Sequence, residues 1–284
     1  MNIIQCAVLT SEQELQIQEL FSFCTSEEPL MQELFLSSAM NVKPKKPCFF
    51  LGYLGQQLVS FLSAFFPTKE EVEFNGFTHP DFRKHGYMSA LIDHALPLFS
   101  EDLFAQALFI REQESQSGWE YLSKRYPVIA RTEYVMEMQS SSWNSFNAAG
   151  QLTEVTKKTQ NTAQKIISEI FEQDEKTSKQ QLGFLLSHPD RQVFLYWVGE
   201  KPIGIANIHA ASQVMIMIHS VGIIPRFRRK GYGYQMIGTL LNYLRTKASI
   251  VSLEVDSDNP PALALYRKLG FYIQNRIDYH ARLF

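Results

Sequence analysis

The sequence contains few cysteines, no long apolar run and almost no net charge. Its three cysteines, Cys6, Cys24 and Cys48, stand at unrelated spacings, and no CxxC pair or His/Cys pattern typical of a metal site occurs. We therefore expect free thiols and no bound metal. Nowhere do about eighteen apolar residues follow one another, and the first residues lack the basic and apolar segments of a secretory signal. These absences exclude a disulfide scaffold and a transmembrane segment, and they predict a cytoplasmic protein with no membrane partner.

Neither sign of charge is in excess, because 27 basic residues stand against 29 acidic ones and the formal net charge is −2. A nucleic-acid-binding surface needs a strong basic excess, so nucleic acid is excluded as a partner. The length of 284 residues predicts about two domains, and a hydrophobic content of 45% is sufficient for packed cores. The composition indicates a globular chain and leaves open whether the protein is a monomer or a homodimer.

One segment, from Val221 to Gly238, joins an apolar strand to a helix through a turn suited to anions. Pro225 ends the strand because proline lacks a backbone donor. The turn holds four cations and two glycines close to the first N–H groups of the helix, namely Arg226, Arg228, Arg229, Lys230, Gly231 and Gly233. Open N–H groups at a helix N-terminus beside guanidinium groups favour a bound phosphate. The segment therefore predicts a small anion site.

Two patterns in this region resemble a known family. Arg228-x-x-Gly231-x-Gly233 is similar to the acetyl-CoA signature of the GNAT superfamily of N-acetyltransferases, (Gln/Arg)-x-x-Gly-x-(Gly/Ala). Farther along, the stretch from Asn259 to Phe271 resembles the family's Asn…Ala…Leu-Tyr…Gly-Phe segment. The resemblance implies an α/β (α+β) fold and acetyl-CoA as cosubstrate. It also implies direct transfer of the acetyl group, through a tetrahedral intermediate, to a primary amine of a small molecule or peptide.

The turn occurs twice in the chain. Pro80–Tyr87 matches Pro225–Tyr232 at an offset of 145 residues, with identical Pro, Phe, Arg, Gly and Tyr. An offset of 144 applies upstream, where Gly55 aligns with Gly199. Continued without a gap to the end of the chain, the offset of 145 aligns two pairs of tyrosines, Tyr121 with Tyr266 and Tyr134 with Tyr279. We predict a tandem duplication with domains at 1–140 and 141–284, each a mixed, mostly antiparallel twisted sheet flanked by helices.

The two copies differ where a cofactor would bind. In the first copy Met88 stands in place of Gly233, and Glu114 stands in place of Asn259. A methionine side chain takes the space of a pyrophosphate, and an extra carboxylate repels a polyanion. We therefore interpret the first domain as a degenerate copy that does not bind acetyl-CoA and has a structural role, either as one wall of the acceptor pocket or as a pseudo-symmetric interface.

The resemblance to the GNAT family also implies roles for residues of the second domain. Cofactor contacts are implied for the strand, the turn and the later segment, namely Val221, Gly222, Ile223, Arg228, Arg229, Lys230, Gly231, Tyr232, Gly233, Asn259, Ala262 and Tyr266. Backbone N–H groups around Ile223 would polarise the acetyl carbonyl. The matching tyrosine of the family lies by the CoA sulfur, which makes Tyr266 the candidate general acid.

The general base is left open between two residues. An alkylamine has a pKa of about 10, so a side chain must accept its proton near neutral pH. His219 is the first candidate, because strand alternation places it on the same face as Met217 and Val221, and family members carry a His or Glu near this position. Glu254 on the neighbouring strand is the reserve. The alternative role of His219 is that of a hydrogen-bonded core residue.

Two other classes of function compete with an acetyltransferase. A dinucleotide-binding oxidoreductase fits Gly231-x-Gly233 followed by Glu254. However, Met236 stands in place of the third glycine of that fingerprint, and only 48 residues follow it, too few for the rest of such a domain. The stronger rival is a non-catalytic acyl-CoA-binding sensor or scaffold protein. Retention of Tyr266 and Asn259 argues against that rival, and no motif identifies the acceptor amine.

Overall fold

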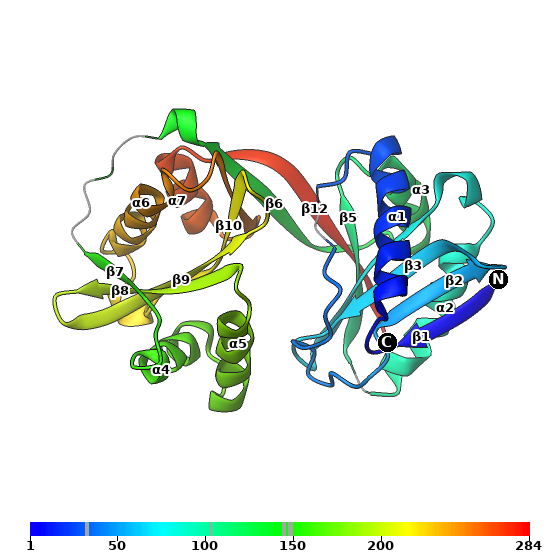
Figure 1. Ribbon diagram of the computed structural model, residues 1–284, viewed down its shortest axis with the longest axis horizontal. Coiled ribbons are helices and arrows are strands. Elements are labelled where there is room, and N and C mark those ends of the chain that lie inside the picture. Colours follow the sequence, from blue (N-terminus) through cyan, green and yellow to red (C-terminus); the bar gives the residue numbers. More distant parts are fainter. Residues whose placement is uncertain (32–33, 103, 144–145, 147–149) are drawn as a thin grey trace. The chain divides into compact units, whose positions relative to one another are not determined.

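The computed structural model describes residues 1–284 except 32–33, 103, 144–145 and 147–149. The chain forms two compact units (Figure 1). The first unit consists of Met1–Thr132 together with Asn275–Phe284, and the second unit is Glu133–Gln274. Each unit is a twisted, mostly antiparallel sheet with helices on its faces, so the predicted α/β (α+β) fold class is confirmed.

The sheet of the first unit has the strand order β1-β2-β3-β4-β5-β12. Its strands are β1 (Asn2–Cys6), β2 (Phe49–Leu54), β3 (Gln57–Phe65), β4 (Glu71–Thr78), β5 (Gln106–Glu112) and the end of β12 (Tyr272–Leu283). β4 and β5 run parallel, and the other neighbours are antiparallel. The helices are α1 (Ser11–Glu27), α2 (Tyr87–Ser100) and α3 (Gln116–Arg125). Figure 1 shows α1 in front of the strands and α2 behind them.

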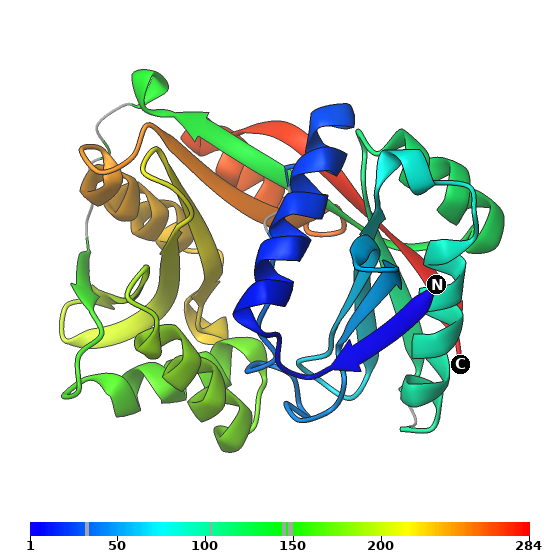
Figure 2. The same ribbon diagram turned by 45° about the vertical axis from the view of Figure 1, so that its right-hand side comes forward.

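The second unit repeats this plan with the order β6-β11-β10-β9-β8-β7. Its strands are the end of β6 (Ile129–Gln139), β7 (Gln151–Glu154), β8 (Arg191–Val198), β9 (Lys201–Ala210), β10 (Met215–Ile223) and β11 (Ile250–Asp256). Again one neighbouring pair, β10 and β11, is parallel. The helices are α4 (Gln160–Phe171), α5 (Glu175–Ser187), α6 (Tyr232–Leu244) and α7 (Pro260–Leu269). Figures 1 and 2 show α4 and α5 on one side of the strands and α6 and α7 on the other.

The two units exchange their last strands. β6 begins in the first unit and ends in the second, where Glu133–Gln139 pairs with β11. β12 begins in the second unit and ends in the first, where Ile277–Leu283 pairs with β5. The domains predicted at 1–140 and 141–284 follow the repeat in the sequence, whereas the compact units divide after Thr132 and after Gln274. The physical reason is that each sheet is completed by a strand from the other half of the chain.

A single extra residue distinguishes the fourth strand of the second unit from that of the first. β10 pairs with β9 in constant register as far as His219 opposite Asn207, and then Gly222 lies opposite Ile205. This one-residue shift is a β-bulge. β4 pairs with β3 in unbroken register from Ser60–Thr78 to Phe65–Glu73. The bulge explains why the repeat offset is 144 before this strand and 145 after it.

The offset does not stay at 145 to the end of the chain, so the gapless alignment is wrong beyond α2. Ser115 caps α3 by accepting a hydrogen bond from the Gly118 N–H, and Asn259 caps α7 by accepting one from the Ala262 N–H. The two caps are 144 residues apart, so the repeat offset at these helices is 144 again. The helix position of Tyr266 is therefore that of Leu122, and the position of Tyr121 is that of Leu265. A slip of one residue turns a helix position by about 100° and reverses a strand face, so the paired tyrosines are not structural counterparts.

A buried ionic network ties the end of β12 to β5 in the first unit. Asp278, whose side chain is 3% exposed, accepts hydrogen bonds from Arg111 Nη1 at 3.0 Å, Arg276 Nε at 2.8 Å and Thr132 Oγ1 at 2.8 Å. The Arg111 side chain is 10% exposed. Because both charges lie away from water, each depends on the other for its solvation.

We predict that Asp278→Ala lowers the free energy of unfolding by about 3–5 kcal/mol, because it leaves the Arg111 guanidinium buried without its counter-charge. Urea denaturation measures this change. Arg282→Ala, on the exposed end of the same strand, is the control and should stay within about 0.5 kcal/mol of the wild type. A loss below about 1 kcal/mol for Asp278→Ala would show that the exchanged strand is held by other contacts.

Candidate functional site

The candidate site of the second unit lies where β10 and β11 separate. The two strands pair in parallel from Met215–Ile250 to Ile218–Leu253. Beyond that point both strands continue, β10 to Ile223 and β11 to Asp256, outside the paired register. Facing strand edges that no longer pair with each other offer backbone donors and acceptors to a ligand. The sheet therefore opens toward the turn that precedes α6.

The bulge of β10 lies at this opening. It includes Ser220, a non-glycine residue with φ of 48°, and Val221, which is half-buried. Gly222 is required by packing, because a Cβ there would lie 2.2 Å from Cγ2 of Ile170 on α4. Bulges next to active sites redirect strand groups out of the ladder. The predicted cofactor residues Val221, Gly222 and Ile223 thus lie in or beside the irregular part of the strand.

The turn after β10 has the backbone of an anion site. A short 3-10 helix, Pro225–Phe227, is followed by Arg229 with φ of 61° and Gly231 with φ of 81°. In the part of the chain that the structure describes, no side chain caps the N-terminus of α6. A Cβ on Gly233 would meet only Leu265, at 3.5 Å, among the described residues, so the space above the first turn of α6 is open. This geometry fits a phosphate or pyrophosphate.

The four cations of the turn differ in their contacts, and Arg226 Nη1 pairs with Glu169 Oε1 on α4 at 2.6 Å. Arg228 Nε donates to the Ile223 carbonyl at 2.9 Å and its Nη2 donates to the Ile170 carbonyl at 3.3 Å. These bonds brace the turn against β10 and α4, so part of the guanidinium is used inside the protein. Arg229 and Lys230 are exposed, and Lys230 Nζ lies 5.6 Å from the Phe227 ring centre. The structure thus leaves Arg229 and Lys230 at the surface beside the open helix end.

The Asn259 segment begins α7 on the other side of the opening. Asn259 Oδ1 accepts from the Ala262 N–H at 3.2 Å, so Asn259 serves as the helix cap. Tyr266, two turns farther along α7, is 6% exposed and its ring centre lies 5.8 Å from that of Phe271. Burial raises the pKa of the Tyr266 phenol to about 12, so the hydroxyl remains protonated at neutral pH. A protonated phenol has the form that a proton donor requires.

His219 lies on β10 immediately before the bulge. Its Nε2 is buried and has no hydrogen-bond partner among the described residues. Burial, and then the charges of Arg191 and His209, lower the pKa of His219 from 6.5 to about 4. The ring centres of His209 and His219 are 6.2 Å apart, and His209 Nε2 lies 2.8 Å from Asp190 Oδ2. His219 is therefore neutral at physiological pH, able to accept a proton but less basic than a free imidazole.

Glu254, the reserve base, lies on β11 with its side chain exposed, between the buried residues Leu253 and Val255. It stands opposite Val135 of β6 in the sheet. Thus the two candidate bases come from neighbouring strands.

Sequence reasoning missed the bulge at Ser220 and the His209–Asp190 pair. The change of offset from 144 to 145 was the available signal for the bulge. The pair carried no such signal, because Asp190 and His209 belong to different elements and meet only through the β8–β9 hairpin.

In the parts of the chain that the structure describes, no three His, Cys, Asp or Glu side chains gather in a way that could hold a metal ion. Within the same residues, no helix combines the length and apolar character needed to cross a membrane.

Residues 158–271, which lie within the second unit, match the model of the acetyltransferase (GNAT) family. A mycothiol acetyltransferase of Corynebacterium glutamicum is 33% identical over 87 residues, which are 30% of this chain and 30% of that protein. The N-alpha-acetyltransferase RimI of Mycobacterium tuberculosis is 35% identical over 68 residues, or 24% of this chain and 42% of that protein. The matched segment spans less than half of either relative.

Two solved structures resemble nearly the whole chain. A GCN5-related N-acetyltransferase from Sphaerobacter thermophilus has a TM-score of 0.75 at 14% identity and covers 99% of this chain and 95% of its own. A tandem GNAT protein from the clavulanic acid biosynthesis pathway has a TM-score of 0.75 at 12% identity, with coverage of 99% and 98%. At these identities the likeness concerns the fold alone, and it confirms the predicted tandem arrangement of two similar units.

We predict that His219 makes stability depend on pH. Its lowered pKa means that below 6.5 the unfolded chain binds a proton that the folded protein does not. The free energy of unfolding should therefore fall by about 1.4 kcal/mol per pH unit from this group as the pH decreases from about 6.5 toward 4. Urea denaturation of the wild type and His219→Gln across this range measures the difference. Parallel curves for the two proteins would contradict the burial of a neutral imidazole.

Proposed function

We propose that the second unit moves an acetyl group from acetyl-CoA to a primary amine of a small molecule or peptide. The single observation that supports this most is the bulged β10 beside the open N-terminus of α6. The opening between β10 and β11 suits the extended, amide-bearing arm of CoA, and the Gly231–Gly233 turn suits its pyrophosphate. The contacts assigned to Arg229, Lys230 and Tyr232 belong to this same proposal.

The chemistry requires three groups in reach of one thioester. The amine nitrogen attacks the acetyl carbonyl, and a C–N bond forms as negative charge develops on the carbonyl oxygen. Backbone N–H groups of the bulge, around Val221 and Gly222, stabilise that oxyanion. The C–S bond then breaks, and Tyr266 donates its proton to the departing thiolate.

The proton of the amine goes to His219 or Glu254. His219 is neutral near pH 7 and lies immediately before the bulge, so it is the first choice. Because its pKa is lowered, His219 is suited to accept a proton from the positively charged adduct that forms after the amine attacks. It is less suited to remove a proton from a free alkylammonium ion. Glu254 is the second candidate for the general base, because its side chain on β11 is exposed to solvent.

The acceptor is proposed only as a class. One relative is named for mycothiol and the other for α-amino groups. A panel of peptide N-termini, sugar–thiol amines, polyamines, aminoglycosides and amino acids therefore tests this chain, with released CoA thiol measured by a thiol reagent. Binding of acetyl-CoA without turnover on any of these amines would favour the acyl-CoA-binding sensor or scaffold instead.

We predict that the second unit provides the acetyl-CoA site, with a stoichiometry near one per chain. Gly233→Met should abolish this binding, because its side chain would enter the open space above the first turn of α6. Gly183→Met is the matched control: Gly183 is an exposed residue of α5 with open space around its Cβ position among the described residues. Isothermal titration checks both variants. Two equivalents of comparable affinity, or unchanged binding by Gly233→Met, would contradict the assignment.

We also predict that Tyr266→Phe lowers kcat by about 10²- to 10⁴-fold, the range of general acid catalysis. The dissociation constant of acetyl-CoA should hardly change, because the ring is kept and the hydroxyl acts as charge develops on sulfur. Steady-state kinetics on an accepted amine, beside a binding titration, measures both quantities. Tyr243→Phe, which loses a hydroxyl bonded to Gln192 near the end of α6, should keep kcat within about threefold. Full turnover by Tyr266→Phe would show that the thiolate leaves without it.

A further inference from the structure

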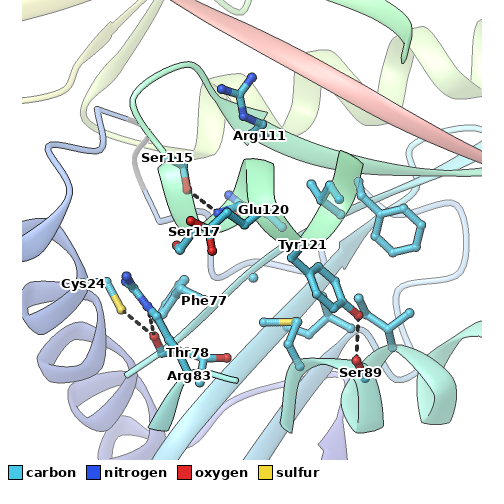
Figure 3. Close-up of a pocket in the computed structure, with 18 of the residues that line it drawn as sticks. Cys24, Phe77, Thr78, Arg83, Ser89, Arg111, Ser115, Ser117, Glu120 and Tyr121 are labelled. Carbon is cyan, nitrogen blue, oxygen red and sulfur yellow. Dashed lines mark hydrogen bonds between the residues drawn. The ribbon is translucent and has the colours of Figure 1, made fainter. Parts of the chain in front are cut away.

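The first unit contains a pocket of about 610 Å³ at the position that corresponds to the opening between β10 and β11. It is lined by the ends of β4 and β5, the start of α2, α3 and the residues after α1. In Figure 3, Cys24 and Arg83 are directed at Thr78 on one side of the pocket, and Tyr121 is bonded to Ser89 on the other. All of its lining residues belong to the first unit, so the pocket is complete within it.

Two strand edges form the walls of this pocket. β4 and β5 pair in parallel from Glu71–Gln106 to Phe74–Phe109, and their paired register ends there. The following residues of both strands, from Asn75 to Thr78 and from Ile110 to Glu112, line the pocket. Their outer edges are paired with β3 and β12. An extended chain with amide groups is the ligand that strand edges recognise, because it matches their alternating donors and acceptors.

The floor of the pocket is apolar. It consists of buried aliphatic and aromatic side chains from the core of the first unit, namely Leu62, Phe74, Ile92, Phe109 and Leu122. The Cys24 thiol is inert, because burial raises its pKa to about 11. This floor favours an apolar group on the ligand.

The rim carries a carboxylate that already occupies the local anion site. Glu28 accepts hydrogen bonds from Ser117 N–H at 2.8 Å, Ser117 Oγ at 2.8 Å and Ser115 Oγ at 3.3 Å. Its Oε1 also lies 3.6 Å from Arg83 Nη1. The positive end of α3 and the Arg83 guanidinium are thus neutralised within the protein. A second anion at this rim would meet the Glu28 charge.

Met88 narrows the pocket at the α2 end, and its Cε lies 3.0 Å from where a Cβ on Gly76 would stand. The Met88 side chain therefore points across the opening toward β4. The prediction that Glu114 replaces Asn259 is wrong, because both Ser115 and Asn259 are helix caps and therefore correspond; Ser115 lines the pocket and Glu114 does not. Three carboxylates line the pocket, and among them Glu28 is the one at the N-terminus of α3, whereas Glu120 pairs with Lys84 and Glu112 accepts from Asn275 Nδ2.

We propose that this pocket of the first unit binds an uncharged, extended chain that carries amide groups and ends in an apolar group, and that Glu28 excludes anionic ligands from it. The strand edges bind the amides, the floor binds the apolar end, and the occupied rim gives the selectivity for an uncharged ligand. The proposal stands apart from the acetyl-CoA site of the second unit, and either can fail without the other.

The probe is N-(2-acetamidoethyl)octanamide, which has two amides, no charge and an apolar tail. Full-length protein with ¹³C-methyl methionine is titrated by NMR, and the Met88 signal is assigned from a Met88→Leu variant. We expect the probe to shift the Met88 signal saturably, while acetyl-CoA shifts methionines of the second unit such as Met217 and leaves Met88 unchanged. Octanoate, which has the same tail and a negative charge, should bind at least about tenfold more weakly than the probe.

Glu28→Gln tests the selectivity, because glutamine keeps a hydrogen-bonding oxygen and removes the charge. We expect this variant to bind octanoate at least about threefold more tightly than the wild type, whereas Glu27→Gln, the exposed neighbour at the end of α1, should show no gain. Failure of the probe to move Met88 in the wild type up to its solubility limit would overturn the site. Octanoate binding as tight as that of the probe, or the same octanoate affinity in Glu28→Gln as in the wild type, would overturn the role of Glu28.

Discussion

In each unit one pair of neighbouring strands is parallel, and its pairing ends before the strands do. Both candidate sites depend on this separation of the strands. A parallel pair inside an otherwise antiparallel sheet must be joined by a helical crossover, here α2 and α6. The strands separate toward the start of that helix, so the open strand edges and the open helix N-terminus are brought to the same place. Backbone amides of two kinds thus converge without any special side chain. The fold itself supplies the binding groups, and the side chains decide what they bind.

The two units use this shared opening differently because of a few residues. In the second unit the bulge adds Ser220 to β10, and Gly233 leaves the helix end open. In the first unit the strand is regular, Met88 crosses the opening, and Glu28 fills the anion site of α3. Duplication therefore yielded one opening suited to a phosphorylated cosubstrate and one that favours uncharged ligands. The two roles are separated by the shape of each opening, through the bulge and Met88, and by its charge, through Glu28.

Local features of the fold could be predicted from the sequence, because local residues determine them. The proline-ended strand, the left-handed Gly231 and the Asn259 cap follow from backbone chemistry, and the repeat predicted the common plan. The strand exchange could not be predicted, because β6 and β12 carry the same apolar pattern whichever sheet they complete. The gapless alignment of the two halves is wrong because the second half has one extra residue in β10 and one residue fewer between α6 and α7. The tyrosines that it pairs therefore do not occupy the same structural positions. Arg228 looks like a phosphate ligand in sequence, yet its partners are carbonyl groups of Ile223 and Ile170 that only the fold brings near it.

Deletion of Ser220 tests the central claim most directly, because it removes the one residue by which β10 departs from the regular β4. We expect that the shortened chain folds, pairs β10 with β9 in unbroken register and still binds acetyl-CoA through the Gly231–Gly233 turn. Its kcat on an accepted amine should fall by at least about 10²-fold, the effect of losing a backbone donor to a developing oxyanion. The measurement is steady-state kinetics beside a titration with acetyl-CoA. Retention of wild-type kcat by the deletion variant would contradict the account, because the bulge would then have no part in the chemistry.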